Sequence, residues 1–190
     1  MPSIERFPLH YGWIILAAGT LGSFMTLPGQ TAGVSVFIDP IAAELSISRT
    51  WVSMAAIGTL AGILPAPLIG RWIDRRGPRI TATMISATLA AACAYMALVE
   101  SRLALLVGFA LLRGSAIGGL SLVSQQVVNL WFVRRRGIAA AAASLGLSAG
   151  AIIFPPLTDH FISLYGWRVA YLILAVLIAS AHFLSPRASM

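Results

Sequence analysis

One arginine, Arg113, interrupts an apolar stretch that runs from Leu103 to Val133. A charged side chain at membrane depth is a functional-site hypothesis by default, and the planar donors of a guanidinium can bond both oxygens of a carboxylate. Arg113 also lies 11 residues after Arg102, about 16 Å along a helix, so snorkelling or pairing with a neighbouring helix is an alternative. Arg113 is therefore a candidate contact for an anion, with a structural role left open.

Polar and small residues follow Arg113 at helical spacing. They are Gly114, Gly118, Ser121, Gln125 and Asn129. On one α-helix they form a single stripe, which in a membrane must face protein or water. Earlier in the chain, Gln30 and Thr31 follow Pro28, where a kink is expected, and polar groups beside a mid-span break are typical of transporter sites. The predicted substrate cavity contains Gln30, Thr31, Arg113, Ser121, Gln125 and Asn129.

The remaining reactive side chains predict neither a metal nor a cofactor. His10, His160 and His182 lack metal-ligand spacing, and Cys93 is expected to be a small buried residue. Ser115 and His182 superficially match the Ser/His pair of six-helix intramembrane proteases. The Gly-x-Ser-Gly setting of that nucleophile is missing, and a Ser/His pair alone is not a triad. We expect no enzyme activity, with an intramembrane hydrolase as a remote alternative.

The composition predicts a membrane protein. The 190 residues are 58% hydrophobic and only 10% charged, whereas soluble domains are about a quarter charged. Crossing the hydrocarbon core takes roughly 20 helical residues, and the charged residues divide the chain into windows of about that length. We predict an all-α membrane protein in which residues 1–190 form one six-helix transmembrane bundle. The predicted helices are 11–38, 50–70, 80–99, 103–133, 137–158 and 169–186.

The arginines predict the orientation of this bundle. The chain has 13 arginines, no lysine and a net charge of +7. Nine arginines fall on one side of the predicted spans: Arg6, Arg71, Arg75, Arg76, Arg79, Arg134, Arg135, Arg136 and Arg187. By the positive-inside rule both termini are cytoplasmic, in a plasma-membrane protein. The positive charge is thus a topology signal, and no nucleic-acid partner is predicted.

Pairs of glycines four residues apart occur in several predicted helices. These are Gly29 and Gly33, Gly58 and Gly62, Gly114 and Gly118, and Gly146 and Gly150. Such pairs let helices approach closely in lipid. We interpret them as helix-packing positions, while bending or rocking of the helices is the alternative.

The segment from Gly70 to Arg79 carries a family resemblance. Its form is Gly-x-x-x-Asp-Arg-x-Gly-x-Arg, with Asp74, Arg75 and Gly77 at the central positions. A solvated positive-inside loop would also explain the charges. The pattern resembles the cytoplasmic signature of the major facilitator superfamily, at the position between the second and third helices where that family carries it.

A second stretch, Trp131 to Ala139, is similar to the triple-basic entry to the fifth helix in monocarboxylate-transporter-like and oxalate:formate-antiporter-like members. Tyr11-Gly12-Trp13 and Gly166-Trp167-Arg168 also look like parts of their signatures. The chain departs from the pattern at Leu9 and His10, which stand where an acidic residue and a glycine are usual.

The resemblance implies the N-terminal six-helix half of a major facilitator, built as two inverted three-helix repeats. It also implies secondary transport of a small solute, with an organic anion or monocarboxylate as the expected class. The partners would be the lipid bilayer, the solute, and a second six-helix half or another copy of this chain. A truncated or half-size transporter is expected, and an inactive fragment or assembly partner is the alternative.

Overall fold

The computed structural model describes residues 20, 22–57, 66–131 and 136–184, and these residues are almost entirely helical. Two segments deviate from α-helix: the 3-10 turn η1 (Leu27–Gly29) and the π-helical segment η3 (Ala116–Ser121). The α-helices are α2 (Thr31–Glu44), α3 (Arg49–Ile57), α4 (Ala66–Arg76), α5 (Pro78–Ala97), α6 (Arg102–Ser115), α7 (Leu122–Trp131) and α8 (Arg136–Leu184). The predicted all-helical class is confirmed for this part of the chain.

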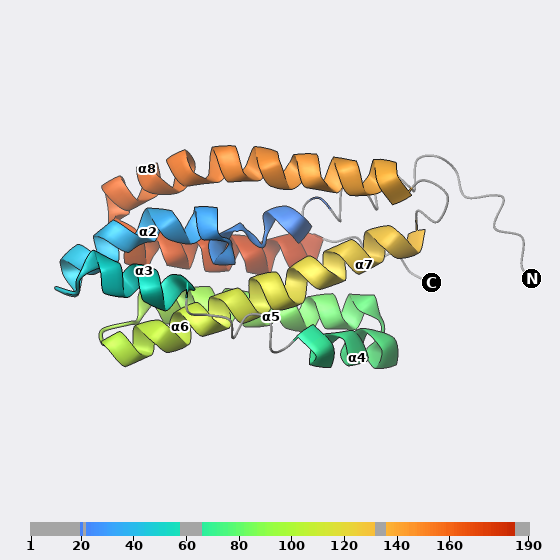
Figure 1. Cartoon of the computed structure of the whole chain (residues 1–190), viewed down its shortest axis with the longest axis horizontal. Coiled ribbons are helices and arrows are strands. Elements are labelled where there is room, and N and C mark those ends of the chain that lie inside the picture. Colours follow the sequence, from blue (N-terminus) through green and yellow to red (C-terminus); the bar gives the residue numbers. More distant parts are fainter. Residues whose placement is uncertain (1–19, 21, 58–65, 132–135, 185–190) are drawn as a thin grey trace, which may run out of the picture.

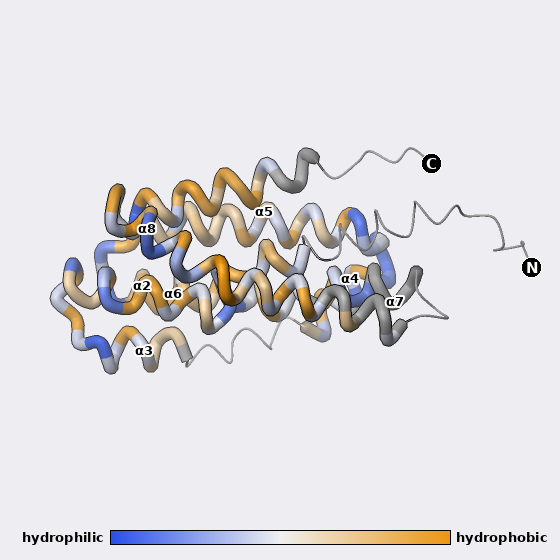
Figure 2. Tube along the Cα trace, turned by 90° about the horizontal axis from the view of Figure 1, so that it is seen from above, coloured by the Kyte–Doolittle hydropathy of each residue, from blue (hydrophilic) through white to orange (hydrophobic). Residues whose placement is uncertain are grey.

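The helices lie side by side in an elongated bundle (Figure 1). Hydrophilic residues gather at its two ends and apolar residues fill the length between them (Figure 2). Three described stretches are long and apolar enough to cross a membrane: Pro78–Ala97, Arg102–Gln126 and Ser144–Ser180. The other predicted spans include residues outside the described ranges, namely 1–19 and 58–65.

The first predicted span is broken at Pro28. The turn η1 interrupts the helix, and Gln30, with an extended backbone (ψ 157°), leads into α2. We expected Asp39 and Pro40 to end this helix at residue 38, but α2 continues to Glu44. Pro40 has no backbone N–H, so one helical hydrogen bond is not made. This loss is tolerated because Pro40 lies close to the end of α2, where the neighbouring Asp39 is exposed.

The segment Gly70–Arg79, which we predicted to join two helices, is itself largely helical. The helix does not end at residue 70, because α4 extends to Arg76 and Gly77 alone separates it from α5. Ile69 and Ile73 are buried one turn apart, so the arginines and Asp74 fit on the exposed side of the same helix. The charges mark where the bundle meets water, and they do not end the helix.

Gly77 makes this tight turn through a backbone conformation that is essentially restricted to glycine. Its φ is 83° and its ψ is 159°. We expect Gly77→Ala to lower the free energy of unfolding by about 1–3 kcal/mol. Gly70→Ala is the matched control, because Gly70 lies inside α4 and an added Cβ meets no described atom within 4 Å. That substitution should stabilise by about 0.5–1 kcal/mol, so thermal melts of the two variants should shift in opposite directions. Equal shifts would contradict the assigned turn.

A second turn of the same form divides α8. Gly166, with φ 80° and ψ 161°, separates a helix over 136–165 from one over 167–184. The predicted fifth helix, 137–158, is therefore longer in the structure, and the predicted sixth helix begins two residues earlier. The Gly77 and Gly166 turns lie at opposite ends of the bundle (Figure 1).

At the Gly166 end, hydrogen bonds join three helices. Trp167 Nε1 donates to Glu44 Oε2 over 2.5 Å, and Arg168 Nε donates to Glu44 Oε1 over 2.9 Å. Arg168 Nη1 also donates to the carbonyl oxygen of Ala97 at the end of α5 (2.9 Å). Glu44 thus joins α2 to the last part of α8, and Arg168 extends the contact to α5.

The hydrogen bond from Arg168 holds the pKa of the Glu44 carboxyl below its usual value near 4.5, against the opposing effect of partial burial. A lowered pKa in the folded state contributes stability above the unfolded value, and this stability is lost as pH falls below it. We therefore expect thermal melts of the wild type to exceed those of Glu44→Gln above about pH 5, with the difference shrinking towards pH 3. The control is Asp39→Asn, because the Asp39–Arg49 pair (2.9 Å) is exposed and should contribute little. A difference that does not vary with pH would contradict this role of Glu44.

Candidate functional site

The fourth predicted span changes its helical form just after Arg113. α6 ends at Ser115, six π-helical residues follow, and α7 continues from Leu122. We call Ala116–Ser121 the π segment. A π-helical turn holds an extra residue and occurs frequently at functional sites. The Gly118-Gly119 pair within it has low helix propensity, which favours an irregular turn there.

The helix break at Leu27–Gly29 lies directly against this span. A Cβ added to Gly29 would meet the Cβ of Ala116 and the carbonyl oxygen of Leu112. Glycine is needed at position 29 because the two backbones approach so closely. The break in the first span and the irregular part of the fourth are therefore in contact.

Arg113 and Thr31, both predicted cavity residues, meet at this contact. Arg113 Nη1 and Nη2 each lie 3.4 Å from Thr31 Oγ1, which accepts from them, at the first residue of α2. Arg113 is half-buried, and its Nε is buried with no hydrogen-bond partner among the described residues. The guanidinium thus keeps unused donor capacity beside a break in the neighbouring helix.

Gln30 is turned towards its own segment. Its Nε2 donates to Thr26 Oγ1 (3.3 Å), whose hydroxyl in turn donates to the carbonyl oxygen of Ser23 (2.6 Å). The Gln30 backbone N–H donates to the carbonyl oxygen of Leu27 (3.0 Å). The side chain and the backbone of Gln30 therefore both make hydrogen bonds within the segment where the helix is interrupted. In this structure Gln30 supports the break that positions Thr31.

Ser121, the last residue of the π segment, is paired with Gln125 in α7. Gln125 Nε2 donates to Ser121 Oγ over 3.3 Å; Gln125 is exposed and Ser121 half-buried. Asn129 lies in α7, and its side chain is outside the described part of the structure. Gly118 is buried in the π segment, and Gly114 is half-buried near the end of α6.

The glycines of the first and fifth predicted helices also lie at close contacts. A Cβ on Gly33 would meet the carbonyl oxygen of Leu27, one on Gly146 would meet Thr20 Cγ2, and one on Gly150 would lie 2.7 Å from Leu27 Cδ1. Gly58 and Gly62 lie outside the described residues. The break is thus packed between the fourth span on one side and the start of α8 on the other.

In the signature segment, Asp74, Arg75 and Arg79 are exposed at the end of α4 and the start of α5. Neither ion pair found among the described residues, Asp39–Arg49 or Glu44–Arg168, includes Asp74. The carboxylate of Asp74 therefore faces water close to the α4–α5 turn.

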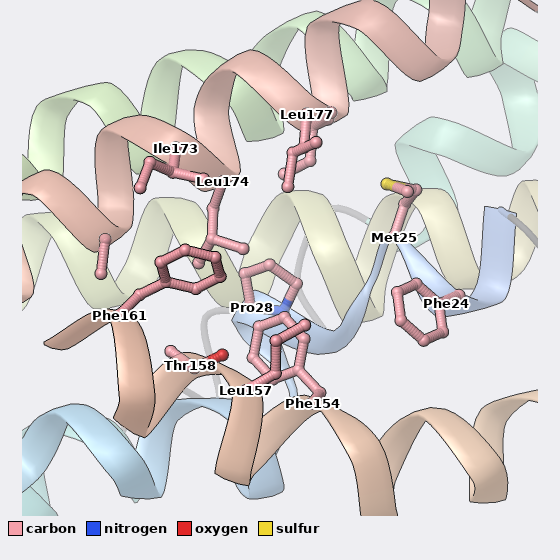
Figure 3. Close-up of a pocket in the computed structure, with 12 residues that line it drawn as sticks. Phe24, Met25, Pro28, Phe154, Leu157, Thr158, Phe161, Ile173, Leu174 and Leu177 are labelled. Carbon is pink, nitrogen blue, oxygen red and sulfur yellow. The ribbon is translucent and has the colours of Figure 1, made fainter. Parts of the chain in front are cut away.

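The sequence did not predict an apolar cavity of about 80 Å³ beside the break. Figure 3 shows Pro28 and Met25 facing side chains from both parts of α8, among them Phe154, Phe161 and Leu174. Thr158 is the one residue with a polar side chain in its lining. Aromatic and aliphatic residues are common throughout this chain, so nothing in the pattern distinguished these. The cavity contains none of the predicted substrate residues.

Ser115 is not arranged as a nucleophile in this structure. It is buried, and its hydroxyl donates to the carbonyl oxygen of Leu111 in its own helix (2.5 Å). The side chain of His182 lies outside the described residues.

Helices long and apolar enough to cross a membrane indicate an integral membrane protein, and one of its arginines lies beside a helix break. Residues 10–187 match the Major Facilitator Superfamily, and the chain belongs to that family.

Its relatives are transporters of small solutes. Monocarboxylate transporter 6 of Homo sapiens is 28% identical over 90% of this chain and 34% of its own length. The oxalate:formate antiporter of Oxalobacter formigenes is 27% identical over 90% of this chain and 42% of its own length. The riboflavin transporter RibJ of Trypanosoma brucei brucei is 26% identical over 94% of this chain and 34% of its own length. The chain thus spans between a third and a little over two fifths of the length of these relatives.

Proposed function

We propose that this chain is a six-helix bundle of a secondary transporter that moves a small organic anion, such as a monocarboxylate, by alternating access. The observation that carries the proposal is the half-buried Arg113 guanidinium, which contacts Thr31 at the helix break and has no partner for Nε among the described residues. A fixed cation with free donors suits a carboxylate. The names of two relatives, a monocarboxylate transporter and an oxalate:formate antiporter, support the same class of solute.

The proposal includes six spans arranged as two inverted three-helix repeats. Two pairs of equivalent features support the repeat. In each pair, the two members lie 89 residues apart in the sequence. Gly77 and Gly166 make turns with nearly the same φ and ψ, and Leu27 and Ala116 begin the two irregular helical segments. The two turns lie at opposite ends of the bundle, as inverted repeats require (Figure 1).

We further propose that both termini lie in the cytoplasm and that the bundle lies in the plasma membrane. The turn between α4 and α5 and the start of α8 lie at the same end of the bundle (Figure 1). That end carries Arg71, Arg75, Arg76, Arg79 and Arg136. An excess of arginine near span ends marks the cytoplasmic side.

Alternating access requires a second bundle to rock against the first. We propose that it comes from a longer form of the same polypeptide, a second copy, or another chain, and that Asp74 and the arginines of the signature segment act at the joint. Thr31 and Gln125 are polar and exposed on this bundle, which favours their lying on a surface that a second bundle covers. A bundle with no transport of its own until it assembles is the second candidate.

Uptake by reconstituted vesicles tests the proposal. The purified chain is placed in liposomes at increasing protein density and offered labelled formate, acetate or oxalate, with labelled glycerol as the uncharged control. We expect saturable uptake of at least one anion above empty vesicles, rising with density if two copies are needed. If every anion stays at the level of empty vesicles at all densities, transport by this chain alone is wrong and the second candidate stands.

A further inference from the structure

The π segment changes which residues face the same way as Arg113. An α-helix turns by about 100° per residue, so Ser121 and Gln125, 8 and 12 positions further on, would point about 80° and 120° away from Arg113. A π-helical turn closes i→i+5 and so accommodates one extra residue, which removes about 100° of that rotation. Ser121 and Gln125 then lie within about 20° of the Arg113 direction.

The burial of neighbouring residues agrees with this register. In an unbroken α-helix, Leu120 and Ser124 would align with Arg113 instead. They are buried, with 5% and 7% of their surfaces exposed, whereas Ser121 is half-buried and Gln125 is exposed. Arg113, Ser121 and Gln125 therefore form one line along the helix, which we call the polar file.

The polar file is longer than a small solute. Ser121 and Gln125 lie up to about 12 and 18 Å from Arg113 along the helix axis, so formate or acetate at Arg113 would not touch Gln125. The file runs from Arg113 towards the end of the bundle where α7 stops and α8 begins, which is also the end that holds the α4–α5 turn (Figure 1).

We propose that the polar file is the path along which a small organic anion moves between the arginine-rich end of the bundle and Arg113, with the π segment setting its register. This inference rests on the proposed transport function. Hydroxyl and amide groups supply hydrogen bonds to a carboxylate that has left bulk water, and the guanidinium attracts negative charge along the line.

Two nearly isosteric substitutions test the register. Ser121→Cys places a thiol on the polar file and Ser124→Cys places one off it, three residues away. Each purified variant is treated in detergent, at about 10 mM salt, with the anionic reagent 2-sulfonatoethyl methanethiosulfonate and with its cationic trimethylammonium analogue. The wild type is the blank, since its one thiol, Cys93, is fully buried. Rates are normalised to those of a free thiol.

We expect the anionic reagent to modify Ser121→Cys at least about tenfold faster than Ser124→Cys, because modification needs an exposed thiolate. The ratio of anionic to cationic rates at Ser121→Cys should also fall by about threefold or more when Arg113→Gln is added, as Coulomb attraction over about 12 Å in water predicts. A faster reaction at Ser124→Cys would overturn the register, and no reaction above the blank at Ser121→Cys would overturn the path. A charge ratio that Arg113→Gln leaves unchanged would overturn the role of Arg113 along it.

These outcomes are independent of the uptake assay, because the labelling needs no transport. If the labelling pattern holds and no anion enters the vesicles, the proposed function fails while the water-accessible file stands. If anions enter and the pattern fails, the function stands and the path is wrong.

Discussion

Replacing Arg113 with glutamine should lower the affinity for the transported anion by at least about a hundredfold and reduce uptake to the level of empty vesicles. The variant loses two charge-assisted hydrogen bonds to a carboxylate, each contributing about 1.5–3 kcal/mol. Glutamine preserves a polar side chain near Thr31, so the bundle should still fold. Equilibrium binding of labelled anion to the purified protein measures the change.

Two further variants separate charge from geometry. Arg113→Lys keeps the positive charge but loses the planar fork, so it should recover only part of the affinity. Arg102→Gln removes an exposed arginine at the start of the same helix and should leave binding unchanged. Binding by Arg113→Gln at wild-type affinity would show that Arg113 only stabilises the helix contact.

The second large effect is expected at Gly29, where the helix break meets the fourth span. A Cβ at this position would meet the Cβ of Ala116 and the backbone of Leu112, so Gly29→Ala must push the two segments apart. Overpacking of this kind costs about 1–3 kcal/mol. The shift also moves Thr31, two residues away, from Arg113. We therefore expect a lower melting temperature together with weaker anion binding.

Gly137→Ala is the control for this prediction, because Gly137 is exposed and an added Cβ meets no described atom within 4 Å. It should leave binding unchanged. Adding Ala116→Gly to Gly29→Ala removes one of the two clashing groups and should restore part of the lost stability and binding. If Gly29→Ala melts and binds like the wild type, the close contact between break and π segment is wrong.

Much of the helical architecture could be predicted from where the charges fall. Apolar windows between arginines indicated helices, and Pro28 indicated the break. The ends of α2 and α4 were predicted too early, because a charged residue shows where a span reaches water and not where its helix ends. In α4, Ile69 and Ile73 keep one side buried while the arginines occupy the exposed side.

The sequence indicates Arg113 and Thr31 as candidate residues, but it could not predict their contact. Arg113 and Thr31 are 82 positions apart, and only the packing of the first span on the fourth brings them together. The π segment could not be predicted, since a Gly-Gly pair inside an apolar stretch fits an α-helix, a kink or a packing contact equally well. Uniform α-helical spacing groups Ser121 with Gly114, whereas the π segment aligns Ser121 with Arg113.

The contact that we propose between the Arg113 guanidinium and the carboxylate of the anion can be measured by solid-state NMR. The protein carries 15N-labelled arginine and is saturated with 13C-labelled formate or acetate in lipid. We predict a 13C–15N dipolar contact within about 4 Å, as a bidentate carboxylate pair requires, and its loss in Arg113→Gln. A bound anion with no arginine contact, or a contact that persists in Arg113→Gln, would contradict the account.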